Sequence, residues 1–286
     1  MEKYINEFKQ MVEIRGLADN TLKSYTYYLK EYLSYVDKYL NKDACQVSWP
    51  EVRDYILFLK NHKKLNPRTI NAHISQLRFF FLYVLHKEWD HYQVPKLKFD
   101  TYLPFVLSQE ETLHFIDTLE NLKHKAIISL MYSSGLRVSE VCNLKYSDIN
   151  RKNMTIYISR SKNRSDRYAA LSENALGILT EYWFAYGKPR EWLFPSPHKK
   201  GRPIVKCTVH RFIKDHVERL GWESRISCHT MRHNYGTHLY ENGADLIAIK
   251  NALGHKCLNS TTIYVHLGGQ RKRSIVSPFD MKVRDE

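Results

Sequence analysis

The chain has 286 residues, of which 43% are hydrophobic and 26% are charged, so it is long enough for two domains of ordinary globular composition. No run reaches the roughly 18 apolar residues that a membrane span needs. The polar start MEKYINEFKQ lacks the apolar segment of a signal peptide, and we therefore expect a cytoplasmic protein. The five cysteines form no CxxC pair, which favours free thiols over disulfides or a zinc knuckle.

The net charge is +14, from 44 basic and 30 acidic side chains. An excess of this size indicates a polyanionic partner, although a generally basic and solvated surface would give the same total. The excess is uneven, because residues 1–100 carry a net +4 and residues 101–286 carry the other +10.

The first hundred residues have the apolar spacing of helices. One helix is predicted over 21–40, a second begins at the SWPE segment (48–51), and a third follows Pro67 in NPRTINAHISQLRFFFLYVL (66–85). Polar side chains on the outer faces of this third helix could contact phosphates or simply be solvated: Arg68, Asn71, His73 and Arg78.

The pattern changes over residues 92–108, where two prolines and a basic–apolar alternation predict an extended linker that carries Lys96 and Lys98. Ser108 and Glu111 then match a capping box, which predicts the start of a new helix. We therefore expect a helical domain over 1–92, a linker over 93–106 and a second domain over 107–286.

The second domain has a mixed pattern. Helices are predicted near 109–120, 123–134 and 138–145, and two short strands over 154–159 and 167–171 flank a basic connection. Ser172 can cap a helix that runs to about residue 186, and Thr208 can cap another that ends at Gly221. Further helices are predicted after His229 and after Ala244.

Two segments of this domain offer basic side chains to an anion. In SSGLRVSEVCNL (133–144), Arg137 follows a glycine turn at a helix start, where a guanidinium can grip two phosphate oxygens. In SKNRSDR (161–167), between the two strands, Lys162 or Arg164 could reach into a groove. A surface arginine and a solvated turn are the plainer interpretations of these two segments.

A third segment, CHTMRHNYGTHL (228–239), places His229 and Arg232 on the same side of a helix. His229 and His233 also have metal-ligand spacing. The zinc motif HExxH would need glutamate where Thr230 stands, so no metal site is predicted. His233 and His238 are interpreted as packing or surface residues.

The fourth segment is LGHKCLNSTTIYVHL (253–267). Gly254 is in the position of a helix C-cap, the turn after it is expected to expose His255, and Asn259 or Ser260 can cap a short helix that presents Tyr264. Taken alone, this segment indicates only a half-buried tyrosine on a capped surface helix.

The four segments together resemble the tyrosine recombinase (phage integrase) family, whose order is Arg, Lys, His-x-x-Arg, Gly-His, Tyr. GLRVSEV, HTMRH and LGHKCLNSTTIYVH are similar to its boxes, and NPRTINAHISQLRFFF resembles the core-binding domain of Xer-type members. One departure is Ser161-Lys162-Asn163, where Xer-like hairpins have Gly-Lys-Gly. Aligning Arg167 and Leu171 with the residues after that hairpin selects Lys162 over Arg164.

This resemblance implies a mainly α fold with a small β-hairpin sheet, in which a SAM-like core-binding domain precedes a catalytic domain of the DNA breaking–rejoining fold. It implies a site-specific recombinase for integration, excision or resolution, in which Tyr264 attacks DNA and forms a 3′-phosphotyrosyl link. Arg137, Arg232 and His255 would stabilise the transition state. His229 would accept the tyrosine proton and Lys162 would protonate the leaving 5′-hydroxyl, without a metal or cofactor.

The implied partners are double-stranded DNA and further copies of the chain, a dimer on each site and a tetramer in the synapse. The candidate DNA contacts are Arg68, Asn71, His73, Arg78, Lys96, Lys98 and Arg164. Two alternatives are a tyrosine-class topoisomerase and a DNA-binding protein of this fold that lacks catalysis. The Xer-like N-terminal pattern argues against the first, and the presence of all six site residues argues against the second.

Overall fold

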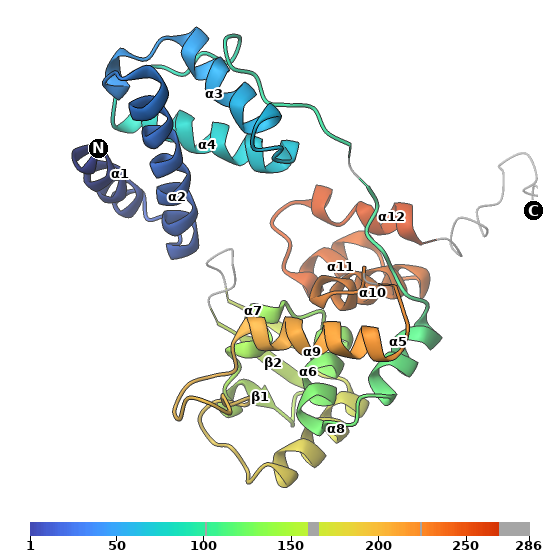
Figure 1. The fold of residues 1–286 in the computed structure, drawn as a ribbon. Helices are drawn as coiled ribbons and strands as arrows, with labels where there is room; N and C mark the ends of the chain where they lie inside the picture. Colours follow the sequence, from blue (N-terminus) through green and yellow to red (C-terminus); the bar gives the residue numbers. More distant parts are fainter. Residues whose placement is uncertain (101, 160–165, 224, 269–286) are drawn as a thin grey trace, which may run out of the picture. The chain divides into compact units, whose positions relative to one another are not determined.

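The computed structural model describes residues 1–100, 102–159, 166–223 and 225–268. The chain divides into two compact units, Met1–Thr101 and Tyr102–Glu286 (Figure 1). The expected fold class, mainly helical with a small antiparallel sheet, is confirmed. In the described part of the chain, no helix has both the length and the apolar character that crossing a membrane requires.

Over its described residues the first unit has helices and no strands. The helix predicted over 21–40 forms, but its last turn is π-helical. Ser48 and Glu51 make a capping box, and the Asn66 side chain accepts a hydrogen bond from the backbone of Thr69. The elements are α1 (Glu2–Ile14), α2 (Asp19–Tyr35), η1 (Val36–Leu40), η2 (Ala44–Gln46), α3 (Trp49–Asn61) and α4 (Pro67–Tyr83).

Aromatic side chains form much of the core of the first unit. Tyr32 packs edge-to-face on Tyr55 with ring centroids 5.2 Å apart, and Phe80 packs on Tyr32 at 6.2 Å. The segment after α4 is tied to this core through Asn71. The Asn71 Nδ2 donates to the Leu97 carbonyl oxygen (2.9 Å), and the Leu97 backbone N–H donates to the Asn71 Oδ1 (2.8 Å).

Because Asn71 satisfies both backbone groups of Leu97, we predict that Asn71→Ala destabilises this attachment by about 1–3 kcal/mol. In hydrogen–deuterium exchange, the peptide that contains Leu97 should lose protection in Asn71→Ala. Arg78→Ala, an exposed position on the same helix, is the control and should leave protection unchanged. Equal protection of the Leu97 peptide in Asn71→Ala and wild type would contradict this role.

The second unit combines helices with one small sheet in the order β1-β2-β3, antiparallel throughout. Ile158 on β2 pairs with Arg167 on β3. The two-residue strand β1 was too short for the sequence to indicate. The elements are α5 (Gln109–Asp117), α6 (Leu122–Ser133), α7 (Val138–Cys142), η3 (Tyr146–Asp148), β1 (Ile149–Asn150), β2 (Thr155–Ile158), β3 (Arg167–Ala170), α8 (Glu173–Ala185), α9 (Lys206–Arg219), α10 (Cys228–Glu241), α11 (Leu246–Leu253), η4 (Leu258–Ser260) and α12 (Ile263–Leu267).

Some predicted caps form and others do not. Ser108 with Glu111 and Ser172 cap their helices as expected. The prediction for Thr208 was wrong, because α9 begins at Lys206 and encloses it. The predicted cap before Tyr264 was also wrong: Asn259 and Ser260 lie in the 3-10 turn η4, and α12 begins three residues after Ser260 without a side-chain cap.

Helix α6 is the centre of the second unit, since it is apolar on nearly all sides and packs against α8 and α10. A smaller cluster of Ile249, Leu253 and Tyr264 joins α11 and α12 to α10. Figure 1 shows these three helices side by side. The third and fourth segments, 228–239 and 253–267, are therefore held on one packed group of helices.

Candidate active site

Arg137 stands at the start of α7, directly after a glycine turn. Gly135 has φ +61°, and a Cβ there would lie 2.5 Å from the Tyr235 ring, so both backbone and space require glycine. The Arg137 backbone N–H donates to Glu140 Oε2, and its Nη1 donates to Glu140 Oε1, each over 2.8 Å. Glu140 therefore fixes one end of the Arg137 guanidinium.

Arg232 on α10 is buried, with 5% of its surface exposed. Its Nη1 donates to the carbonyl oxygen of Gly135 and its Nη2 to that of Leu253, each over 2.5 Å. Burial and the nearby charge of Arg137 lower the pKa of Arg232 to about 10, so it stays cationic at neutral pH. One side chain thereby joins the turn before Arg137 to the end of α11.

His255 follows the left-handed Gly254, as the sequence predicts. It is half-buried rather than exposed, because its Nδ1 lies 2.9 Å from Thr261 Oγ1 and its ring stacks on Tyr264 at 10° with centroids 6.4 Å apart. Burial, then the charges of Arg232 and Arg137, lowers the pKa of His255 to about 4. The imidazole is therefore neutral at neutral pH.

Tyr264 is buried, with 1% of its surface exposed, and not half-buried as its segment alone indicates. A Cβ on Gly236 of α10 would lie 2.5 Å from the Tyr264 Cζ, so the absence of a side chain at position 236 makes room for the ring. Burial raises the pKa of Tyr264 to about 12, while the charges of Arg232 and Arg137 act in the opposite direction. Tyr264 is therefore protonated in this state.

His229 lies exposed in the first turn of α10, and His233 lies one turn further along the same helix. The His233 ring centroid is 6.5 Å from that of His229 and 6.2 Å from that of Tyr264. Over the described residues, no group of three His, Cys, Asp or Glu side chains could hold a metal ion. Lys162 and Arg164 lie outside the described residues.

Five of the six predicted site residues thus gather around α10. Arg232 touches the turn that carries Arg137 and the helix end that precedes His255, and His255 stacks on Tyr264. Sequence reasoning missed Glu140 as a member of this group, although its position three residues into α7 is that of a capping glutamate.

The candidate DNA contacts of the first unit differ in exposure. Arg68, Arg78, Lys96 and Lys98 are exposed, and Arg68 lies over the Phe99 ring. Asn71 is engaged with Leu97.

The prediction for His73 needs correction. It is 1% exposed and its Nδ1 lies 3.2 Å from the Tyr55 hydroxyl, because its position on α4 faces the core. It has no surface to offer to DNA.

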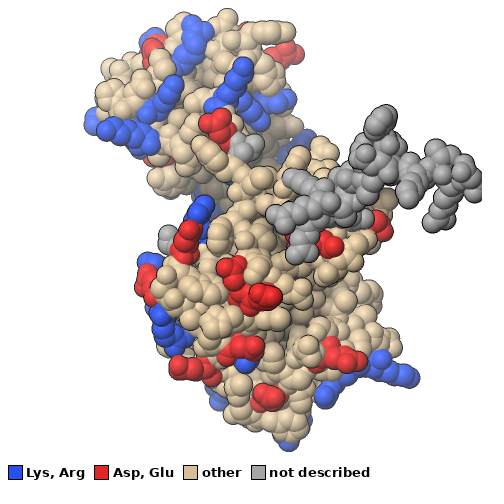
Figure 2. Space-filling view, turned by 90° about the vertical axis from the view of Figure 1, so that its right-hand side faces the viewer, with Lys and Arg blue, Asp and Glu red and all other residues tan. Residues whose placement is uncertain are grey.

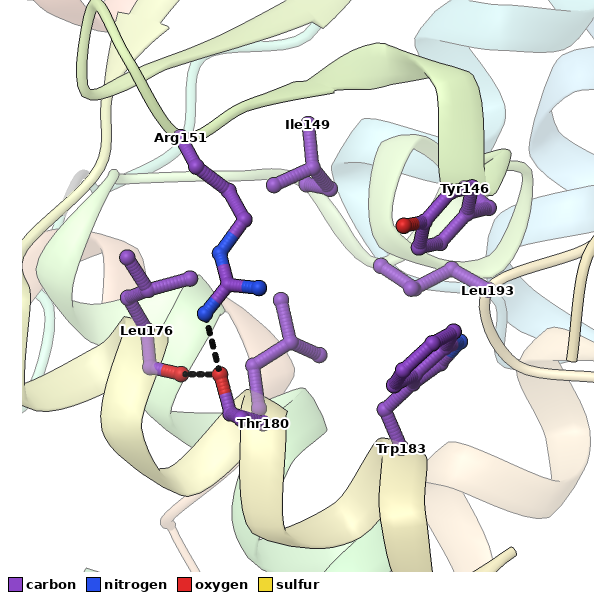
Figure 3. Close-up of a pocket in the computed structure, with 8 residues that line it drawn as sticks. Tyr146, Ile149, Arg151, Leu176, Thr180, Trp183 and Leu193 are labelled. Atoms are coloured by element: carbon purple, nitrogen blue, oxygen red, sulfur yellow. Dashed lines mark hydrogen bonds between the residues drawn. The ribbon is translucent and has the colours of Figure 1, made fainter. Parts of the chain in front are cut away.

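Acidic side chains and an apolar pocket mark other parts of the second unit. On the face drawn in Figure 2, Asp and Glu side chains are spread over the second unit, so the basic excess of its sequence is not displayed evenly. Figure 3 shows an apolar pocket between Tyr146, Leu176 and Trp183, in which Arg151 bonds Thr180. None of the predicted site residues lines this pocket.

Comparison with known proteins agrees with the fold. The Phage integrase family matches residues 106–271, and the Phage integrase N-terminal SAM-like domain matches residues 4–91. A tyrosine recombinase of Thermosipho africanus is 32% identical over 289 residues, which cover 95% of this chain and 98% of the relative. The tyrosine recombinase XerD of Oceanobacillus iheyensis is 30% identical and covers 98% of both chains.

A solved structure of the XerH site-specific recombinase bound to its difH substrate, a post-cleavage complex, has a TM-score of 0.72 at 22% identity, covering 91% of this chain and 80% of that one. The chain therefore belongs to the phage integrase family. It is a tyrosine recombinase, an enzyme of site-specific DNA cleavage and rejoining.

The Gly236 contact leads to a prediction about Tyr264. In Gly236→Ala the new methyl group would overlap the ring, so the tyrosine must leave its buried position. Tetranitromethane should then nitrate the tryptic peptide 257–271, whose one tyrosine is Tyr264, several-fold faster than in wild type. Gly177→Ala, on α8 with no atom near the added carbon, should not change the rate. Unchanged nitration in Gly236→Ala would refute the contact.

The lowered pKa of His255 gives a pH dependence with a defined sign. The folded pKa of about 4 lies below the ordinary histidine pKa of about 6.5, so between these values the unfolded chain binds more protons and stability falls as pH falls. This histidine contributes at most about 3 kcal/mol. In thermal melts from pH 7 to 4, His255→Gln should show a shallower fall of the melting temperature than wild type. Parallel profiles would contradict the assignment.

Proposed function

We propose that Tyr264 is the nucleophile of this recombinase and that Arg137, Arg232, His229, His255 and Lys162 assist it. The observation that carries the proposal is the position of Arg232, a buried cation that contacts both the Arg137 turn and the end of α11. Three segments that lie far apart in the sequence thereby converge on one tyrosine.

The chemistry follows from charge. A phosphodiester repels nucleophiles, and further negative charge builds on its non-bridging oxygens in the transition state. Arg137 and Arg232 supply fixed positive charge for those oxygens, and His255 adds a hydrogen bond. Each of the two arginines is anchored by its neighbours before any substrate arrives, so little reorganisation is needed.

Tyr264 must lose its proton in order to attack. Its pKa of about 12 in this state means that the hydroxyl is protonated at neutral pH. His229, exposed at the start of α10, is proposed to accept the proton as the hydroxyl attacks phosphorus. Lys162 is proposed to give a proton to the 5′-oxygen as its bond to phosphorus breaks, which leaves a free 5′-hydroxyl. A second 5′-hydroxyl can then attack the phosphotyrosyl bond, which rejoins the DNA and releases Tyr264.

The substrate of this reaction is proposed to be double-stranded DNA bound by both units. Four exposed basic side chains of the first unit are the proposed phosphate contacts: Arg68, Arg78, Lys96 and Lys98; Arg164 of the second unit is a further one. A solved structure of similar fold is a lambda integrase dimer bound to a COC′ core site, and it supports a dimer of this chain on each DNA site. A tetramer is proposed to hold two such sites together. The cellular outcome is proposed to be integration, excision or resolution of an element.

The test begins with a DNA site. Duplexes with a randomised segment are enriched by repeated binding to the protein, and the selected duplex is remade with a nick that lets the cleaved end escape. Wild type should then form a covalent protein–DNA complex that survives denaturation, and Tyr264→Phe should form none while binding equally well. A covalent complex with Tyr264→Phe would show that another residue is the nucleophile.

Arg137→Ala should slow this cleavage by about a hundredfold or more, because it removes a donor to the charge that develops. Its affinity for the duplex, measured by gel shift, should change by less than about tenfold, since many phosphate contacts remain. Arg151→Met, in the pocket of Figure 3, is the control. A loss of binding with unchanged cleavage at saturation would assign Arg137 to binding instead.

A further inference from the structure

Arg167 occupies an unusual position for a residue at the start of a strand. Its side chain is only 10% exposed, and it forms two parallel hydrogen bonds to one carboxylate. Its Nη1 donates to Glu140 Oε1 over 2.8 Å, and its Nη2 donates to Glu140 Oε2 over 2.9 Å. This two-pronged geometry is the strongest that a guanidinium and a carboxylate can adopt.

Glu140 is fully engaged by these contacts. Oε1 accepts from Arg137 Nη1 and Arg167 Nη1, and Oε2 accepts from the Arg137 backbone N–H and Arg167 Nη2. A carboxylate has about four acceptor positions, and all four are used. Burial alone would raise the pKa of Glu140, but the bonds and charges of Arg167 and Arg137 hold it at about 2.

The other side of Arg167 lies against the turn that carries His255. A Cβ on Gly254 would lie 2.7 Å from the Arg167 Cδ and 3.0 Å from its Nε. The side chain is therefore packed between Glu140 on α7 and the C-cap of α11. A shorter or displaced side chain at position 167 would free both the carboxylate and this turn.

The charges around the Arg167–Glu140 ion pair indicate that the pair does more than stabilise the fold. Besides burial, the charges of Arg137 and Arg167 lower the pKa of Arg232, and Glu140, which pairs with both, acts in the opposite direction. Buried ion pairs contribute little to stability over apolar packing, because desolvation offsets their attraction. They do fix geometry, and the geometry fixed here is that of Arg137 and of the turn before His255.

We infer that Arg167 is a positioning residue for DNA cleavage: it holds the Glu140 carboxylate that orients Arg137, and it supports the Gly254 turn that presents His255. This rests on the proposed roles of Arg137 and His255. Arg167 does not touch the phosphate in this scheme. It lies at the start of β3, so a single side chain joins this strand to α7 and to the turn after α11.

The test compares single-turnover cleavage of the selected nicked duplex with affinity for it. Arg167→Met should cleave about a hundredfold more slowly at saturating protein, as expected for a misplaced catalytic group, while its affinity for the duplex stays within a few-fold of wild type. Arg167→Lys keeps the charge but cannot bond both oxygens in parallel, so it should recover only part of the rate. Arg151→Met, with an exposed guanidinium bonded to Thr180, should cleave at the wild-type rate.

A double-mutant cycle separates positioning from a general structural role. If Arg167 acts through Glu140, then Glu140→Gln with Arg167→Met should cleave no more slowly than the slower single variant. Rate losses that multiply would overturn the inference, and so would wild-type cleavage by Arg167→Met. If Arg167→Met does not fold, Arg167→Lys provides the test. A folded lysine variant that cleaves at the full wild-type rate would also overturn the inference.

Failure of the proposed site gives a different result from failure of this inference. If wild type forms no covalent complex, or if Tyr264→Phe forms as much of it as wild type, the assignment of the nucleophile fails. The inferred role of Arg167 then fails as well. If wild type cleaves through Tyr264 and Arg167→Met cleaves equally fast, only the positioning role of Arg167 fails.

Discussion

The arrangement of the site depends on one buried cation. Arg232 bonds the carbonyl oxygens of Gly135 and Leu253, which precede Arg137 and His255 respectively. A guanidinium is suited to this, because its rigid fork can satisfy two backbone acceptors and keep its charge. Without Arg232, the carbonyl oxygens of Gly135 and Leu253 would lose their hydrogen-bond donor. The turn before Arg137 and the end of α11 would then no longer be bonded to one side chain.

Tyr264, the proposed nucleophile, is held by packing, and the residues proposed to assist it are held by polar contacts. Tyr264 belongs to a small apolar cluster with Ile249 and Leu253, and Gly236 makes room for its ring. Burial keeps its hydroxyl protonated while the neighbouring arginines favour the charged form. Burial outweighs the two arginines in this state, so the pKa of the Tyr264 hydroxyl stays above its ordinary value.

Much of the fold follows from local patterns in the sequence. The periodicity of α2 and α4, the capping pair Ser108 and Glu111, and the glycine turn at Gly254 all depend on neighbouring residues, so the sequence indicates them correctly. Contacts over long separations could not be read in this way. His73 stands three residues after Ile70 and four before Leu77, so periodicity places it on the apolar side of α4. Nothing local indicates that it meets Tyr55, or that Asn71 bonds Leu97.

The same limit applies to the site. The motif residues could be named from the sequence, but the pairing of Arg167 with Glu140 joins positions 27 residues apart. The burial of Tyr264 depends on Gly236 of another helix, which the segment around the tyrosine does not reveal. Periodicity identifies which residues can face a common side. It does not indicate which distant helix covers them.

The turn before Arg137, helix α10 and the end of α11 are proposed to activate one tyrosine, Tyr264, among the 20 in the chain. The most direct test is to trap the covalent complex on the nicked duplex, digest the protein with trypsin and the DNA with nuclease, and sequence the peptide that retains a nucleotide. The account predicts a phosphotyrosyl link at Tyr264 in the peptide 257–271. A nucleotide attached to any other residue would contradict it.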